Sequence, residues 1–119
     1  MPEAISHAAV SLARDLRVKA FLIPTTSGST ARMIARYRPA QPLIAISSEA
    51  STVRALCLVW GVHPVLVPSY RSTDAMVRLA QDKARASGYV KRGDLVAITA
   101  GLPLHKAGTT NLITVQPVE

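Results

Sequence analysis

Residues 25 to 30, Thr-Thr-Ser-Gly-Ser-Thr, bring together the side chains of this sequence that are best suited to binding chemistry. The hydroxyls beside the glycine can donate hydrogen bonds, and the glycine lets the backbone come close to a ligand. No Asp or Glu occurs from Ala20 through Ser48. This pattern favours a phosphate group as the ligand. The candidate phosphate-binding residues are Thr25, Thr26, Ser27, Gly28, Ser29 and Thr30, with Arg32 as a second contact.

The same hydroxyls also have a purely structural explanation. The segment lies where a strand-like apolar run meets a helix-forming segment, and the amides at a helix start attract anions. Ser and Thr side chains, however, also cap helices and shape turns. The residue types leave both explanations open. The glycine-rich phosphate motifs of nucleotide hydrolases and dinucleotide-binding proteins are absent, so nucleotide hydrolysis has no support.

A second polar loop covers residues 100 to 111, Ala-Gly-Leu-Pro-Leu-His-Lys-Ala-Gly-Thr-Thr-Asn. His105 and Lys106 could offer charge to an anionic ligand, and Gly108 helps to form a structured turn, so these three residues are further candidate contacts. A lysine on a loop is usually solvated, and the threonines that follow also fit the start of a strand. Both interpretations of this loop stay open.

Catalytic and metal sites are poorly supported by the sequence. The three histidines have no metal-ligand spacing with one another or with the carboxylates. No G-x-S-x-G motif occurs, and seven acidic residues make a magnesium site hard to assemble. We therefore expect no catalytic residue, no metal ligand and no cofactor in this chain. The single cysteine, Cys57, is expected to be a small buried hydrophobe.

The candidate loops are positioned by alternating helices and strands. Apolar periodicity and capping signals predict helices over residues 3–16, 31–38, 48–58 and 72–87, the last capped by Ser72 and ended by Gly88, with Arg78 paired to Asp82. Buried strands are predicted over residues 18–23, 43–46, 63–67, 94–99 and 111–115. This order predicts an α/β fold with a mostly parallel sheet. The last two strands are separated by a loop too short for a helix, so the last strand is expected to be antiparallel.

Composition limits the class of protein. A chain of 119 residues with 49% hydrophobic residues predicts one domain over residues 1–119. The net charge of +7 invites a nucleic-acid partner, but the basic residues are dispersed and one Phe and one Trp offer no stacking platform. No apolar stretch is long enough to span a bilayer, and no signal peptide is evident. We expect a cytoplasmic protein that binds neither nucleic acid nor membranes.

Three separated segments resemble the C-terminal domain of pyruvate kinase: TTSGSTARMIARYRP, LVWGVHPVLV, and KRGDLVAITAGLP ending in GTTNLITV. The resemblance covers residues 4–115 and implies a three-layer α/β/α sandwich with a five-stranded mixed sheet. In that family the domain is regulatory, and a separate (β/α)8 barrel binds phosphoenolpyruvate, ADP, magnesium and potassium. The resemblance therefore implies no catalysis by this chain alone. Its first residues match the inside of the family's first helix, which suggests truncation.

In many members of that family the loop matching residues 25–30 holds a phosphate of fructose 1,6-bisphosphate. Members that respond to this sugar commonly carry a tryptophan and an arginine on or before the helix matching residues 72–87. On or just before residues 72–87 this sequence has no tryptophan, and Met76 stands at the position of the arginine. The departure favours a monophosphorylated sugar or a nucleoside monophosphate as the effector. The loop at 100–111 is closer to bacterial forms.

Family members are usually tetramers, and this domain supplies one of the two interfaces, partly through its last strand. The resemblance thus implies a homodimer of this domain and a tetramer of the full enzyme. The alternatives are a free-standing relative that binds phosphate ligands without kinase activity, a small enzyme acting on phosphate esters, and a nucleic-acid-binding protein.

Overall fold

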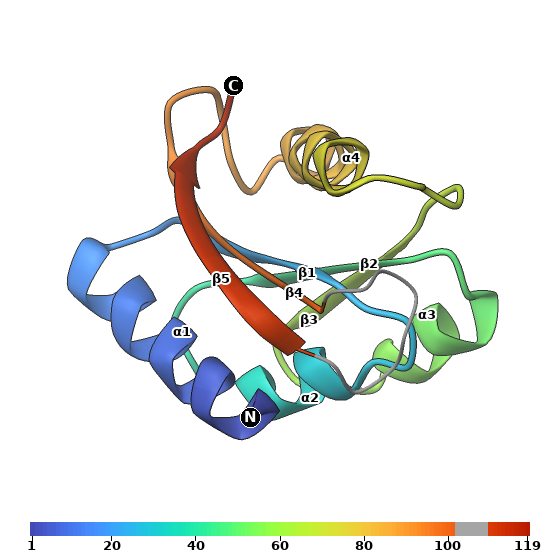
Figure 1. The fold of residues 1–119 in the computed structure, drawn as a ribbon, viewed down its shortest axis with the longest axis horizontal. Coiled ribbons are helices and arrows are strands. Elements are labelled where there is room, and N and C mark those ends of the chain that lie inside the picture. Colours follow the sequence, from blue (N-terminus) through green and yellow to red (C-terminus); the bar gives the residue numbers. More distant parts are fainter. Residues whose placement is uncertain (102–109) are drawn as a thin grey trace.

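The computed structural model describes residues 1–101 and 110–119 and has one five-stranded sheet covered by helices on both faces (Figure 1). The elements are α1 (Pro2–Leu16), β1 (Ala20–Pro24), α2 (Ser29–Ala35), β2 (Leu43–Ser47), α3 (Ala50–Leu56), β3 (Val62–Leu66), α4 (Thr73–Ser87), β4 (Leu95–Gly101) and β5 (Thr110–Pro117). The strand order is β3-β2-β1-β4-β5. The first four strands are parallel, and β5 pairs antiparallel with β4. The expected α/β class and the antiparallel last strand are confirmed.

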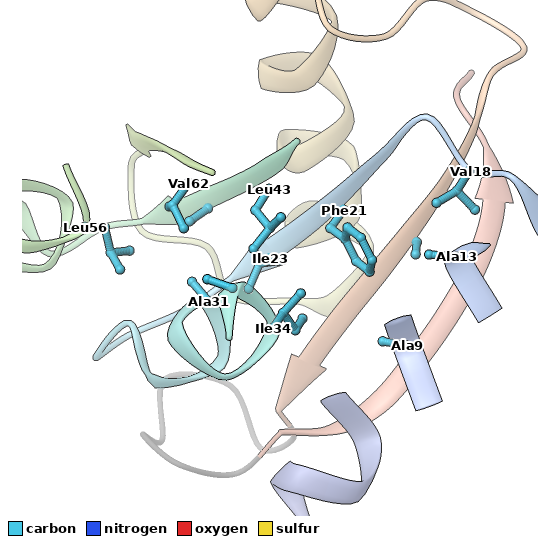
Figure 2. Close-up of a cluster of buried hydrophobic side chains, with 13 residues drawn as sticks. Ala9, Ala13, Val18, Phe21, Ile23, Ala31, Ile34, Leu43, Leu56 and Val62 are labelled. Atoms are coloured by element: carbon cyan, nitrogen blue, oxygen red, sulfur yellow. The ribbon is translucent and has the colours of Figure 1, made fainter. Parts of the chain in front are cut away.

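The helices divide unequally between the two faces. Figure 1 shows α1, α2 and α3 on one face of the sheet and α4 on the other. Side chains of the central strand β1 alternate between the faces, since Phe21 packs in a cluster with α1 and α2 while Leu22 packs in a cluster with α4. Figure 2 shows the first cluster, in which Phe21 of β1 lies on the same face as Ala13 of α1 and Ile34 of α2. This double burial explains why β1 is apolar at every position.

The core accounts for much of the stability. Phe21, Leu22, Ile23 and Ile44 are fully buried, and each large apolar side chain contributes about 1.5–3 kcal/mol when it is removed from water. The small residues Ala9 and Ala13 of α1 let that helix lie close to the sheet. The position of the loop after β1 is therefore set by a rigid and well-packed strand.

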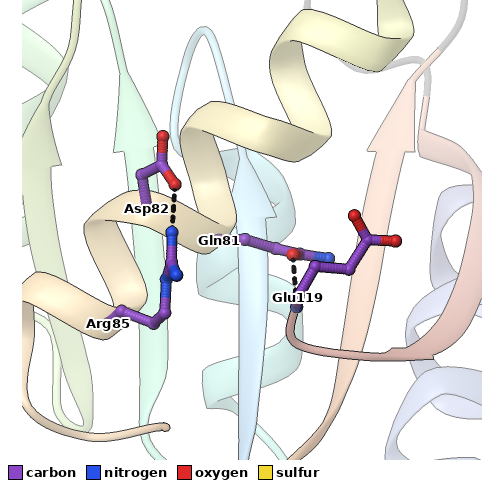
Figure 3. A network of polar contacts seen from close by, with 4 residues as sticks. All are labelled: Gln81, Asp82, Arg85 and Glu119. Atoms are coloured by element: carbon purple, nitrogen blue, oxygen red, sulfur yellow. Dashed lines mark hydrogen bonds and ion pairs between the residues drawn. The ribbon is translucent and has the colours of Figure 1, made fainter. Parts of the chain in front are cut away.

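Helix α4 follows the predicted signals at both ends. The Ser72 hydroxyl accepts a hydrogen bond from the Ala75 amide at 3.0 Å, and Gly88 ends the helix with φ of 84°. The predicted pairing of Asp82 with Arg78 is wrong. Asp82 pairs with Arg85 instead, at 2.6 Å (Figure 3), an i,i+3 pair in which the acid precedes the base.

The C-terminal end of the described chain is attached to the buried face of α4. Gln81 is almost fully buried, and its Oε1 accepts a hydrogen bond from the Glu119 amide at 3.1 Å (Figure 3). Its Nε2 donates to Gln116 at 3.2 Å. The polar side chain at a buried helix position is thus satisfied by the segment that leaves β5.

Two helices are shorter than the sequence predicted. Helix α2 ends at Ala35 rather than at residue 38, and α3 ends at Leu56 rather than at residue 58. The expectation that Cys57 is buried is wrong, because its side chain is exposed. Thr52 and Leu56 occupy the inward face of α3 at i,i+4 spacing, so the next residue is rotated away from the core. None of the helices in the described ranges has the length and apolar character to cross a membrane.

Candidate anion-binding site

The segment 25–30 lies at the carboxyl edge of the parallel strands, where it leaves β1 and enters α2. Gly28 precedes the first residue of α2 with φ of 89° and ψ of 0°, a left-handed conformation that favours glycine. In open α/β sheets ligands bind at this edge. The structure therefore places the predicted segment where the fold offers a site.

Gly28 permits a close approach between the loop and two side chains. A Cβ built on Gly28 would lie 3.0 Å from Nη1 of Arg32 and 3.2 Å from Cδ2 of Leu56. The guanidinium of Arg32 therefore folds back from α2 and lies against the backbone of the loop. This brings the predicted second contact, Arg32, against Gly28 of the predicted segment.

Ser27 and Ser29 form the outer part of the loop. Ser27 is exposed and Ser29 is half-buried, and their hydroxyl oxygens are 3.2 Å apart. The Ser29 amide makes a long hydrogen bond of 3.4 Å to the Ser27 hydroxyl. Gly28 has no side chain to cap α2, so the amides of the first helical turn receive no hydrogen bond from the N-cap residue. The Ser27 and Ser29 hydroxyls thus lie next to each other at the solvent-facing rim of the loop.

Thr25 and Thr30 serve the internal architecture of the loop. The Thr25 hydroxyl accepts a hydrogen bond from the Gly28 amide at 2.8 Å, which closes the turn. Thr30 is buried, and its hydroxyl is hydrogen-bonded to that of Thr110 at the start of β5. The structural explanation of the hydroxyls therefore applies to these two residues, while Ser27 and Ser29 lie at the surface.

Thr26 connects the loop to α3. Its carbonyl accepts a hydrogen bond from the Thr52 hydroxyl at 2.7 Å, and its side chain is half-buried. The sequence reasoning did not identify Thr52 or Thr110 as partners of the loop. Both are hydroxyl residues at the start of a neighbouring element, and a single sequence gives no signal for such long-range contacts.

Thr99 is a further residue that the sequence reasoning missed. Its side chain is fully buried on β4, and its hydroxyl has no hydrogen-bond partner in the described part of the chain. Alternation along β4 places Thr99 on the same face as Ala97, which packs in the cluster with α1 and α2. The polar residue at the end of the apolar run 95–98 was the available signal.

Arg38, which lies downstream of the segment in sequence, has its guanidinium 4.7 Å from the ring of Trp60. The predicted contacts His105, Lys106 and Gly108 lie outside the described residues. In residues 1–101 and 110–119, no three His, Cys, Asp or Glu side chains cluster in a way that could hold a metal ion.

Comparisons with known proteins give a consistent result. The family model described as "Pyruvate kinase, alpha/beta domain" matches residues 3–116. The chain is 42% identical over 117 residues to the pyruvate kinase of Clostridium acetobutylicum, covering 98% of this chain and 25% of that protein. It is 45% identical over 118 residues to that of Sporosarcina psychrophila and 45% over 116 residues to that of Geobacillus stearothermophilus. These two alignments cover 99% and 98% of this chain and 20% of each relative.

Proposed function

The chain belongs to the pyruvate kinase family, in which it matches the C-terminal alpha/beta domain, and from this we propose that it binds a phosphorylated effector at residues 25–30. One observation carries the proposal: the Arg32 guanidinium lies against the glycine of a loop whose rim carries Ser27 and Ser29. The nearest acidic residues along the chain are Asp15, which precedes β1, and Glu49, which follows β2.

The groups of the loop have distinct roles in this proposal. Arg32 supplies a charge-assisted hydrogen bond to a phosphate oxygen, and the Ser27 and Ser29 hydroxyls donate to the other oxygens. The absence of a Cβ on Gly28 leaves room for the Arg32 guanidinium against the backbone of the loop. Because α2 has seven residues, we attribute the affinity to these hydrogen bonds and to the cation rather than to a helix dipole.

Two hydrogen bonds connect the proposed site with other elements. Thr26 is bonded to Thr52 of α3, and Thr30 is bonded to Thr110 of β5. A ligand that changes the shape of the loop would act on both elements through these bonds, and contiguous contacts of this kind can carry coupling to a distant site. Regulation of a distant site would begin with displacement of α3 or β5.

The effector proposed for this loop is a monophosphorylated sugar or a nucleoside monophosphate. The position expected to hold an arginine for a second phosphate is Met76, a buried residue of α4 that is 1% exposed. A buried thioether offers no charge to a phosphate. This supports a ligand with one phosphate group over fructose 1,6-bisphosphate.

A homodimer through β5 is the second part of the proposal, with a tetramer in the full-length enzyme. β5 is eight residues long and lies at the edge of the sheet, and its residues from Leu112 to Gln116 are half-buried. A long edge strand of this kind is suited to pairing with another chain. Light scattering at high protein concentration tests this part, and a monomeric mass contradicts it.

We infer that kinase activity resides in the part of the longer relatives that this chain does not match. The chain spans about a fifth to a quarter of their length. We infer that transfer of phosphate from phosphoenolpyruvate to ADP, with magnesium and potassium, needs the barrel domain and that these 119 residues alone have no kinase activity. A free-standing protein with the same binding function is the alternative, and synthesis of ATP by the isolated chain would contradict both.

Calorimetric titration with phosphate monoesters tests the binding proposal. The panel contains glucose 6-phosphate, ribose 5-phosphate, AMP and fructose 1,6-bisphosphate. Ser29→Glu places a carboxylate at the rim and should abolish binding by electrostatic repulsion, whereas Thr26→Ala should weaken it. Ala86→Glu, on the exposed side of α4, is the control with the same change in charge. Equal affinity of Ser29→Glu and the unmodified chain would reject the site.

A further inference from the structure

A basic pocket lies at the amino edge of the sheet, at the opposite end of β1 from the loop 25–30. It has a volume of about 400 Å³ and lies between the end of α1 and the turn that connects α2 with β2. Arg14, Arg17, Lys19 and Arg38 line it together with Tyr37 and Gln41. Figure 1 shows these two connections at the end of the sheet where β1 and β2 begin.

The charged side chains that line this pocket are all positive. Four cationic side chains line it, and its lining residues include no Asp or Glu. Arg14 has an acidic neighbour, since its Nε is 4.0 Å from Asp15, but both side chains are 74% exposed and such a pair is weak. In the described ranges no ion pair involves Arg17 or Lys19. The pocket therefore presents uncompensated positive charge.

The backbone at two of these arginines is unusual. Arg17 has φ of 53° and Arg38 has φ of 49°, and in the described chain these are the non-glycine residues with positive φ. Glycine adopts this conformation without strain and stands at the other positive-φ positions. Both positions thus carry a cationic side chain on a backbone conformation that glycine would adopt with less strain.

The backbone around the cations is fixed by hydrogen bonds. The Gln41 side chain donates to the Ala13 carbonyl at 3.3 Å and joins the two walls. The Val18 amide donates to the same carbonyl at 3.1 Å, and the Lys19 amide donates to the Leu95 carbonyl at 2.8 Å. The Cα positions of Arg17 and Lys19 are thus held before a ligand arrives, which lowers the entropic cost of binding.

We propose that this pocket binds a small anion carrying at least two negative charges on phosphate groups. Converging cations with no lining carboxylate favour such a ligand. The concave shape and the size of the pocket suit a small molecule better than an extended polyanion. Arg38 also contacts Trp60, so Arg17 and Lys19 are the residues whose charge has no other use in the described structure.

Titration of the full chain with pyrophosphate, followed by amide NMR shifts, tests this inference. Shifts are expected at residues 14–19 and 37–41. Arg17→Gly removes the charge while keeping the backbone conformation and should weaken binding about tenfold. Arg17→Lys should retain most of the affinity. Arg78→Gln, on the exposed face of α4, is the control for the loss of one positive charge.

The loop and the pocket are distinguished by the variants. Binding that survives Ser29→Glu and is about tenfold weaker in Arg17→Gly supports the pocket. Shifts confined to residues 25–32 overturn this inference while supporting the proposed effector loop. Absence of binding at millimolar pyrophosphate, or equal affinity in Arg17→Gly and Arg78→Gln, also overturns it. Binding of heparin or duplex DNA at these residues without binding of pyrophosphate overturns the assignment to a small anion.

Discussion

The side chain of Arg32 lies directly over the backbone of Gly28, at the point where a Cβ on Gly28 would be 3.0 Å from Nη1. The glycine thus makes room for the cation and also adopts the positive φ with which the loop enters α2. These two roles depend on the same missing side chain. A substitution at Gly28 is therefore expected to affect both stability and the position of the guanidinium.

Gly28→Ala is predicted to destabilise the chain by about 2–3 kcal/mol. The left-handed conformation costs about 1 kcal/mol for alanine, and the new methyl group presses on Leu56 in the core as well as on Arg32. Gly88→Ala is the matched control, because Gly88 has φ of 84° and nothing within 4 Å of a Cβ. Urea unfolding measures both. Equal losses of stability would show that close packing at Gly28 is unimportant.

Arg32→Gln is predicted to weaken the binding of phosphate monoesters about tenfold, since a charge-assisted hydrogen bond is replaced by a neutral one. The glutamine retains helix propensity, so the free energy of unfolding should change little. Calorimetry measures the affinity, with Arg78→Gln as the control for net charge. If both variants bind alike, the guanidinium has no specific role at the loop.

The hydroxyl pair Thr30 and Thr110 should behave as a coupled unit. Both residues are buried, so replacing either by valine leaves the other hydroxyl unpaired, at a cost of about 1–3 kcal/mol. The double variant should lose less than the sum of the two single losses. Thermal or urea unfolding of the four proteins gives the coupling energy. Additive losses would mean that the pair contributes nothing to the attachment of the loop to β5.

Thr99→Val is predicted to stabilise the chain by about 1 kcal/mol. The buried Thr99 hydroxyl has no partner in the described structure, and valine has the same shape without the unpaired group. The free energy of unfolding measures the change. A loss of stability would mean that the hydroxyl is satisfied in solution, and the same variant in the effector titration would then show whether Thr99 supports the loop.

The sequence predicted the fold through features that depend on neighbouring residues. The apolar run at residues 20–23 predicted a doubly buried strand, and the capping signals at Ser72 and Gly88 predicted both ends of α4. The antiparallel β5 followed from the short connection before it. The helix ends at Ala35 and Leu56 were missed, because packing against the sheet rather than helix propensity decides where these short helices stop.

The sequence predicted that the segment 25–30 connects the first strand to a helix, but not how its hydroxyls divide between internal bonds and the surface. Sequence alone left the hydroxyls open between ligand binding and capping. The structure shows that Thr25 and Thr30 are engaged internally and that Ser27 and Ser29 lie at the surface. Their partners Thr52 and Thr110 come from elements that are distant in sequence, and no periodicity reports such contacts. The predicted pairing of Asp82 with Arg78 was wrong because Arg85 is also within reach of Asp82 on the helix.

The five-residue strand β1 separates Lys19 from Thr25, a distance of about 20 Å along an extended chain. Salt in the cell screens charge over about 8 Å, so two anions at the ends of this strand would hardly feel each other's field. Coupling between the two ligands would therefore require a movement of β1, which is packed against the core on both faces. Ligands at the two ends of β1 would then bind independently of each other unless the strand itself moves.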